Sequence, residues 1–314
     1  MSIQRCPNEI LDIVFQLLPI QPPDNAPAVV LSTMLTCSRF CAIAKRHLLR
    51  VVCLQTAERV NLFAMYLTQL INTGAYDEAR HPIEHMAVLG TCRTTQRPWR
   101  GQSAVEQEAA NILPFIISTV APGLHSLVIF GYDCQFLPEQ VNGLRVRNIV
   151  QSSVRFQNLT RLILLEQSIV MLHGEENSLH YCYPRLTSLY THTRHINLAL
   201  RTLRDLRFHI IDGSWALYSP IPSEPHIETI TIDALTYEKS IMVGGNERQQ
   251  TRQQYHKRIE DYHTLVKSHS KSLESRVVTT DSPRAGVGSI LRAWRDIVQG
   301  GSGCWKKEWR PAAL

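Results

Sequence analysis

The sequence contains no apolar run long enough to span a bilayer and no stretch with the features of a secretory leader. The first apolar stretch, Ile10 to Leu18, includes Asp12 and Gln16 and has no suitable cationic lead-in. The later stretch from Ile112 to Val120 is too short to cross a membrane, and Pro114 interrupts it. We therefore expect a soluble, intracellular protein, in the cytoplasm or nucleus, that makes no membrane contact.

Sequence motifs for catalysis and nucleotide binding are also missing. The sequence has no phosphate-binding loop of the form G-x-x-x-x-G-K-[ST], no H-E-x-x-H and no G-x-S-x-G. The pairs His180-x-Cys182 and His192-x-x-His195 could ligate zinc in principle, but their spacing fits no standard ligand pattern. We therefore expect no enzymatic activity, no cofactor and no metal site.

The charge and the cysteines narrow the possible class of protein further. Charged residues make up 19% of the chain and apolar residues 44%, which is typical of a globular protein. The net charge of +6 comes with no aromatic and basic motif, so we expect no nucleic-acid partner. The eight cysteines form no C-x-x-C pair, and a chain of 314 residues can build a core without disulfides. Reduced thiols are the expected state.

The amino-terminal segment has the pattern of a helix that is apolar around most of its circumference. Pro7 suits the first helical turn, Glu9 complements the helix dipole, and apolar residues recur at helical spacing from Ile10 to Leu18. Such a helix must be covered on more than one side. Periodicity alone leaves two alternatives open, namely that the rest of this chain covers it or that a partner protein does.

Two runs in this region resemble the F-box motif. The run from Cys6 to Leu18, C-P-N-E-I-L-D-I-V-F-Q-L-L, resembles the opening L-P-x-E-[LI]-L-x-x-I-F-x-x-L, and the run from Leu35 to Ala44 resembles the second signature more loosely. The resemblance implies a three-helix module over residues 1–55 that docks on a Skp-family adaptor, and through it on the cullin of a ubiquitin ligase. The adaptor contacts that it implies are Pro7, Ile10, Leu11, Val14, Phe15, Leu18 and Arg39.

A pattern L-x-x-L-x-[LIF], or a close variant of it, recurs through the middle of the chain. Its copies begin at Ile83, Leu124, Leu159, Leu186, Leu203 and Ile227, at intervals of 41, 35, 27, 17 and 24 residues. One short strand cannot bury its apolar face alone, whereas stacked copies share a core. We therefore predict an irregular leucine-rich-repeat-like α/β solenoid over residues 56–243, with a helix from Gln102 to Val120. An ordinary α/β domain with short apolar strands is the alternative.

In such a solenoid, the residues between the inward positions line the concave surface. Four of them are our candidate substrate-binding residues: Arg161, Tyr190, Arg204 and Arg207. Other polar side chains of the same set are His85, His125, Ser126, Thr160, Ser188, Asp205, Glu228 and Thr229. The alternative is that all of these are simply solvated strand residues.

The region from residue 244 to residue 314 predicts two amphipathic helices, Asn246 to Leu273 and Ile290 to Val298, with a short strand at Val277 and Val278 between them. Solenoid ends need covering, so we interpret the helices as a cap over the last repeat. A helix that binds a partner is the alternative.

Together these features predict an α/β protein with a three-helix F-box module, a leucine-rich-repeat-like solenoid and a helical carboxyl-terminal cap. The combination resembles fungal F-box proteins, especially those of basidiomycetes. The resemblance implies a substrate receptor that joins a protein substrate to a Skp–cullin–F-box ubiquitin ligase. The alternative is a leucine-rich-repeat-like scaffold that takes no part in ubiquitin transfer.

Overall fold

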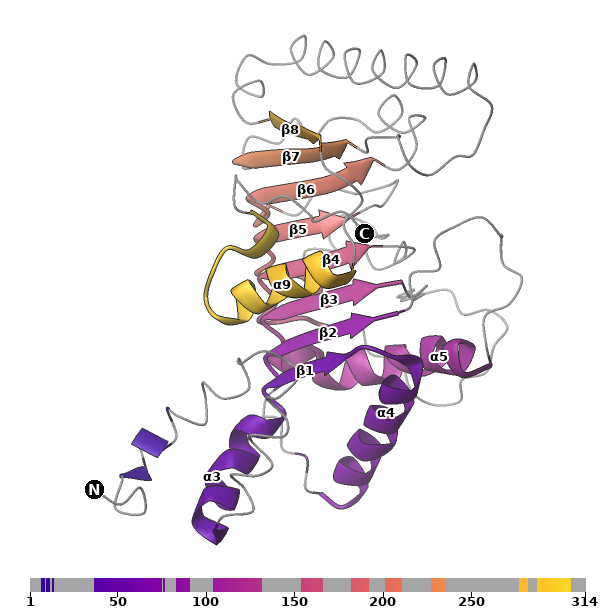
Figure 1. Ribbon diagram of the computed structural model, residues 1–314, viewed down its shortest axis with the longest axis vertical. Coiled ribbons are helices and arrows are strands. Elements are labelled where there is room, and N and C mark those ends of the chain that lie inside the picture. The colour runs from indigo at the N-terminus through magenta and orange to yellow at the C-terminus, as the bar shows by residue number, and fades with distance from the viewer. Residues whose placement is uncertain are drawn as a thin grey trace.

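A computed structural model provides the structure of the chain (Figure 1). It describes residues 7–8, 10–11, 13, 37–74, 76, 83–90, 104–131, 154–165, 182–191, 201–210, 227–234, 277–281 and 287–305. The predicted helix from Asn246 to Leu273 lies outside these residues, as do Val14, Phe15 and Leu18.

The centre of the molecule is an open sheet of eight parallel strands that follow one another in chain order (Figure 1). The strands are β1 (Val51–Leu54), β2 (His85–Leu89), β3 (Ser126–Phe130), β4 (Arg161–Leu165), β5 (Ser188–Thr191), β6 (Asp205–Ile210), β7 (Thr229–Ala234) and β8 (Val277–Asp281). Each strand pairs with its neighbours in sequence, and every pair is parallel. The α/β class is thereby confirmed.

The recurring apolar pattern accounts for the strands. All six predicted copies coincide with strands β2 to β7. In the copy at β4, Leu159 is buried just before the strand, and Leu162 and Leu164 are buried on one face of it. Side chains alternate between the two faces of a strand, so the second and fourth positions of every strand share one face. This face and the residues just before the strands form the main core.

Two helices cover this face of the sheet. They are α4 (Ala57–Asn72) and α5 (Ala104–Val120), which continues into the short 3-10 helix η3 (Ala121–Gly123). The Thr56 hydroxyl caps α4 by accepting a hydrogen bond from the Arg59 N–H. The helix predicted from Gln102 to Val120 is confirmed as α5, which starts two residues later. Helix α4 was not predicted, although Val60, Ala64 and Leu67 are buried at helical spacing.

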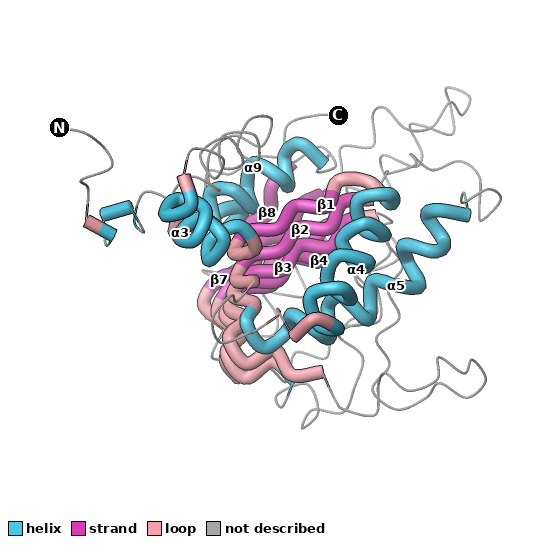
Figure 2. Tube along the Cα trace, turned by 90° about the horizontal axis from the view of Figure 1, so that it is seen from below, coloured by secondary structure: helices cyan, strands magenta, loops and turns pink. Residues whose placement is uncertain are grey.

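A third helix lies on the opposite face of the sheet. Helix α9 (Val287–Val298) is followed by the short 3-10 helix η5 (Gly303–Trp305). Figure 2 shows α4 and α5 on one side of the strands and α9 on the other. The prediction of an amphipathic helix here is confirmed, but its expected position is wrong. The helix packs on β2, β3 and β4 in the middle of the sheet and does not cap its end.

The boundary predicted near residue 243 does not end the sheet either. The short strand expected at Val277 and Val278 forms as β8, which pairs with β7. Residues from the predicted carboxyl-terminal region therefore contribute both an edge strand and a covering helix.

The amino-terminal region contributes a small separate cluster. Helix α3 (Ser38–Leu48) is capped at its amino end by Cys37, whose sulfur accepts a hydrogen bond from the Phe40 N–H. Leu11 is 2% exposed and packs against Phe40, Ile43 and Ala44 of this helix. The cluster has no residue in common with either of the two clusters around the sheet.

Candidate functional site

The first, third and fifth positions of the strands form the sheet face beneath α9. The register places the first positions side by side across the sheet in the order Val51, His85, Ser126, Arg161, Ser188, Asp205 and Thr229. The third positions follow in the order Cys53, Ala87, Val128, Ile163, Tyr190, Arg207 and Thr231. From β2 to β4 this face is apolar at its third and fifth positions, and toward β6 and β7 it becomes polar. We call it the α9 face.

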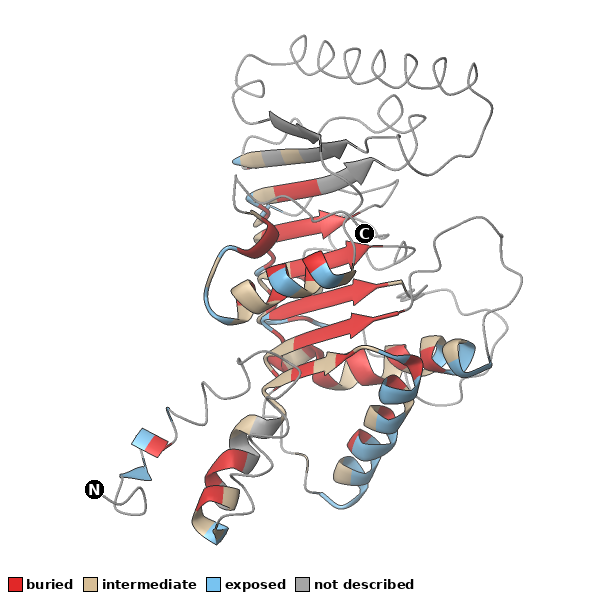
Figure 3. Cartoon of the chain, in the orientation of Figure 1, coloured by how far each residue is buried: buried red, intermediate tan, exposed pale blue. Residues whose placement is uncertain are grey.

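Helix α9 covers the apolar part of the α9 face. Its sheet-facing side chains are Ile290, Ala293, Trp294 and Ile297, each exposed by 4% or less. They contact an apolar surface formed by Ala87, Leu89, Val128, Phe130, Ile163, Leu165 and Tyr190. The spacing of the helix residues is that of one face of an amphipathic helix, so the packing follows directly from the sequence. In Figure 3 the strands around this contact, β2 to β5, are coloured mostly as buried.

Trp294 is the polar anchor of this contact as well as its largest side chain. Its indole Nε1 donates a hydrogen bond to the Ser126 Oγ, 3.2 Å away. The same Oγ lies 2.9 Å from Nδ1 of His85 on the neighbouring strand. Because the indole can only donate, the Ser126 hydroxyl accepts from Trp294 and can donate its own hydrogen to an unprotonated His85 Nδ1.

The surroundings of His85 keep the imidazole neutral. Burial disfavours the charged form and lowers the pKa of His85 from 6.5 to about 4. The neighbouring His125, whose ring centroid is 6.2 Å away, and the guanidinium groups of Arg50 and Arg161 lower it further. The Glu84 carboxylate lies 3.9 Å from His85 Nε2 and forms a shorter 2.7 Å ion pair with Arg50.

Two arginines of the α9 face bind the turn that follows α9. Arg161 Nη1 donates to the backbone carbonyl of Gly301 over 2.6 Å, and Arg207 Nη1 donates to the backbone carbonyl of Cys304. Arg207 is 1% exposed, and its guanidinium lies 5.4 Å from the centre of the Tyr190 ring. The distance fits a cation–π contact. The two arginines therefore hold the end of α9 through backbone oxygen atoms.

The turn between α9 and η5 is built on glycine. Gly300 and Gly303 have φ values of 84° and 60°, in the left-handed region that favours glycine. A Cβ added to Gly303 would clash with the Ile297 side chain. The Gly303 N–H donates a hydrogen bond to Asp296 Oδ2 over 2.7 Å. The chain thus folds back closely on α9, which brings the Gly301 and Cys304 carbonyls to the arginines.

The predicted substrate-binding residues have separate environments. Arg161, Tyr190 and Arg207 lie together on the α9 face, but Tyr190 and Arg207 are buried and Arg161 is half-buried beneath the carboxyl-terminal turn. The expectation that Tyr190 and Arg207 line an open surface is therefore wrong. Arg204 precedes β6, is exposed, and lies 3.6 Å from the Glu228 carboxylate. It does not belong to the α9 face.

The residues implied as adaptor contacts are also divided. Pro7 and Ile10 are exposed, whereas Leu11 packs inward on α3. Arg39 Nε donates to Asn8 Oδ1 over 2.7 Å, so the two motif runs meet. The neighbouring Ile13, which was not among the implied contacts, is 53% exposed.

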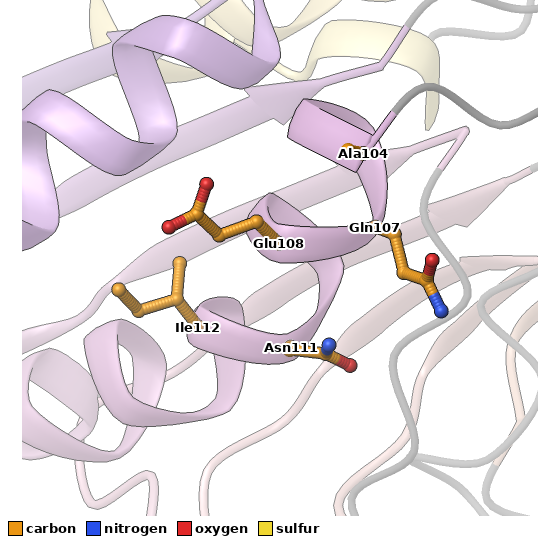
Figure 4. Close-up of a pocket in the computed structure, with 5 residues that line it drawn as sticks. All are labelled: Ala104, Gln107, Glu108, Asn111 and Ile112. Atoms are coloured by element: carbon orange, nitrogen blue, oxygen red, sulfur yellow. The ribbon is translucent and has the colours of Figure 1, made fainter.

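Among the described residues, the arrangement offers no evident catalytic or metal centre. No group of three or more potential metal ligands occurs in this part of the chain. Cys182 is the only residue of the candidate zinc pairs that the structure describes, and none of the described cysteines forms a disulfide. A shallow, open depression on α5 is lined by Ala104, Gln107, Glu108, Asn111 and Ile112 (Figure 4). Its one carboxylate, Glu108, accepts a hydrogen bond from Asn61 of α4.

Comparisons with known proteins identify no relative. No family model matches the chain, and neither the curated proteins nor the solved structures gave a significant match. Within the described residues, no helix has the length and apolarity needed to cross a membrane. The functional interpretation therefore depends on the geometry of the chain itself.

Proposed function

We propose that this chain is the substrate-receptor subunit of a Skp–cullin–F-box ubiquitin ligase. Residues 1–55 form an F-box module that docks on a Skp-family adaptor, and the sheet region is an irregular leucine-rich-repeat-like solenoid that receives a protein substrate. The protein acts by raising the local concentration of substrate near the ubiquitin carrier and performs no chemistry itself. It works in the cytoplasm or nucleus.

The observation that carries this proposal is the division of the amino-terminal helix into two apolar sides. Leu11 is buried against α3, yet Ile10 and Ile13 are 48% and 53% exposed. A partner that covers the exposed side would bury both isoleucines, and large apolar side chains of this kind dominate the energetics of many interfaces. The residues stand in the run that resembles the F-box opening, which is where an adaptor would dock.

The order of the strands supports the second half of the proposal. Parallel strands that follow one another in sequence are what stacked leucine-rich-type units produce, and β2 to β7 are each preceded by a buried leucine or isoleucine. The intervals between copies are irregular, so the units differ in length. A protein built in this way presents a long face suited to another protein rather than a cavity suited to a small substrate.

Co-expression with a Skp-family adaptor tests the proposal. We expect a stable one-to-one complex from wild type, and a much weaker one from the double variant Ile10→Asp with Ile13→Asp. Losing the burial of two half-exposed isoleucines costs about 2 kcal/mol or more, which is about thirtyfold in affinity. The substitutions target exposed positions, so the module keeps its own packing.

A matched control is Leu62→Asp, which replaces an exposed apolar residue on α4. It is expected to leave adaptor binding unchanged. Leu11→Asp is a poorer test, because it also removes the contact with α3. A wild-type chain that stays monomeric in the presence of the adaptor would refute the ligase role and favour a leucine-rich-repeat-like scaffold.

A further inference from the structure

Lysine is distributed unevenly along the chain. Between residues 46 and 238 the sequence contains sixteen arginines and no lysine. The seven lysines of the sequence stand on either side of this interval: Lys45, Lys239, Lys257, Lys267, Lys271, Lys306 and Lys307. The interval contains strands β1 to β7 and helices α4 and α5. Strand β8 and helix α9 contain no lysine either, so Lys45 of α3 is the one lysine within the described residues.

The particular properties of the guanidinium group explain only some of these arginines. Arg207 is buried with its guanidinium over the Tyr190 ring, a position that suits a planar, weakly hydrated cation better than an ammonium. Four other arginines are exposed: Arg59, Arg185, Arg201 and Arg292. Arg185 Nη1 donates one hydrogen bond to Asn158 Oδ1 over 3.3 Å, which a lysine ammonium could also form. At such positions, packing and hydrogen bonding do not account for the choice of arginine.

Arginine and lysine differ in their chemistry toward ubiquitin. In ubiquitin transfer, the unprotonated ε-amine of a lysine attacks the thioester carbonyl carbon that joins ubiquitin to a cysteine of the carrier. An amide bond forms, the carbon–sulfur bond breaks, the cysteine leaves as a thiolate, and the amine nitrogen releases a proton to water. The guanidinium of arginine stays protonated at neutral pH and offers no such nucleophile. Arginine therefore gives a surface positive charge without making it an acceptor for ubiquitin.

This difference matters at the place where the proposed function puts the chain. A receptor that holds a substrate near the ubiquitin carrier brings its own surface within reach of the same carrier. A lysine on that surface would be present in every complex, whereas the substrate is present only while it is bound. The receptor would then compete with its substrate for ubiquitin and would be marked for degradation itself.

We propose that the lysine-free interval protects the sheet region from ubiquitin transfer within its own ligase, so that a carrier close to it modifies the bound substrate instead. Ubiquitin that does reach this chain is attached to lysines outside residues 46–238. The proposal rests on the proposed function, because it concerns transfer in the complex with the adaptor and the cullin.

Ubiquitin transfer to the receptor itself tests the proposal and needs no substrate. The assay contains the full chain, a Skp-family adaptor, a cullin and a charged carrier, with methylated ubiquitin that cannot form chains. The test variant carries four substitutions: Arg59→Lys, Arg185→Lys, Arg201→Lys and Arg292→Lys. These positions lie on α4, before β5, before β6 and on α9, so they sample different parts of the surface.

The matched control replaces the same four arginines by glutamine, which supplies no amine. All four positions are exposed, so both variants are expected to keep the stability and the adaptor binding of wild type. Urea denaturation and co-purification with the adaptor check this before the transfer assay.

We expect the lysine variant to receive at least about three times as much ubiquitin per complex as wild type, because the new amines share the high effective concentration of the carrier. Peptide mapping should find the added ubiquitin on the new lysines, and the glutamine variant should stay at the wild-type level. A lysine variant that joins the complex and gains no ubiquitin would overturn the proposal and leave the receptor role standing. A chain that never binds the adaptor would overturn both.

Discussion

Lowering the pH from 7.5 to 5 is expected to destabilise the protein through His85. Its side chain is only 15% exposed, and its Nδ1 lies against the hydroxyl of Ser126 beneath Trp294. Burial is the main reason that its pKa in the folded protein falls to about 4, compared with 6.5 for an ordinary histidine. The imidazole is therefore neutral in the folded protein over a pH range in which the unfolded chain protonates.

The sign and size of the effect follow from this difference. As the pH falls below 6.5 the unfolded chain takes up a proton at His85 and the folded protein does not, so the free energy of unfolding decreases. The loss is complete near pH 4. A difference of about 2.5 in pKa corresponds to about 3 kcal/mol in total, of which about 2 kcal/mol is already lost at pH 5.

Urea denaturation at pH 7.5 and pH 5 measures the effect, with His85→Gln as the reference variant. Other groups also titrate in this range, so the quantity to compare is the loss between the two pH values in each protein. We expect wild type to lose about 2 kcal/mol more than the variant. Equal losses in the two proteins would show that His85 is not held neutral by its surroundings, and the packing described around it would then be incorrect.

Three further predictions concern the packing of the sheet and its helices. Trp294→Ala should cost about 3–5 kcal/mol of stability, whereas Trp294→Phe should cost about 1–3 kcal/mol, because it loses the indole hydrogen bond but fills most of the space; thermal or urea denaturation distinguishes them. Gly303→Ala should be more destabilising than Gly74→Ala, because both glycines have positive φ but only Gly303 has a side chain packed against its Cα; equal losses would contradict the close turn. Leu162→Ala should cost about 2–5 kcal/mol and Leu62→Ala less than about 0.5 kcal/mol, since the first is fully buried and the second is 63% exposed; similar losses would contradict the assigned faces.

Much of the sheet could be predicted from the sequence because its signal is local. Leu159, Leu162 and Leu164 show the anchor and the alternation within six residues, and the same pattern marks the strands on both sides. The helix Ala57–Asn72 had a signal of equal strength, with a capping Thr56 and buried residues at helical spacing. The predicted copies of the repeat begin only at Ile83, and no element was predicted for the segment before it.

The site could be predicted only in part because it depends on contacts between distant segments. The stripe from Ile290 to Ile297 indicates that one side of a helix is covered, but a stripe does not say what covers it. Arg161 and Arg207 were correctly placed on one face by the alternation of the strands. Each donates to a backbone carbonyl far along the chain, 140 residues away for Arg161 and 97 for Arg207. Any residue type can supply a carbonyl, so no sequence pattern marks these contacts.

Arg207 distinguishes the polar end of the α9 face from the other side of the sheet. The opposite face of β2, β3 and β4 is apolar throughout. Arg207 is instead placed in a fully buried position, where desolvation of its charge is costly. Its hydrogen bond to the Cys304 carbonyl and its cation–π contact with Tyr190 offset part of this cost. The hydrogen bond forms only when the turn after α9 lies on the sheet, so Arg207 couples the folding of this turn to that of β6.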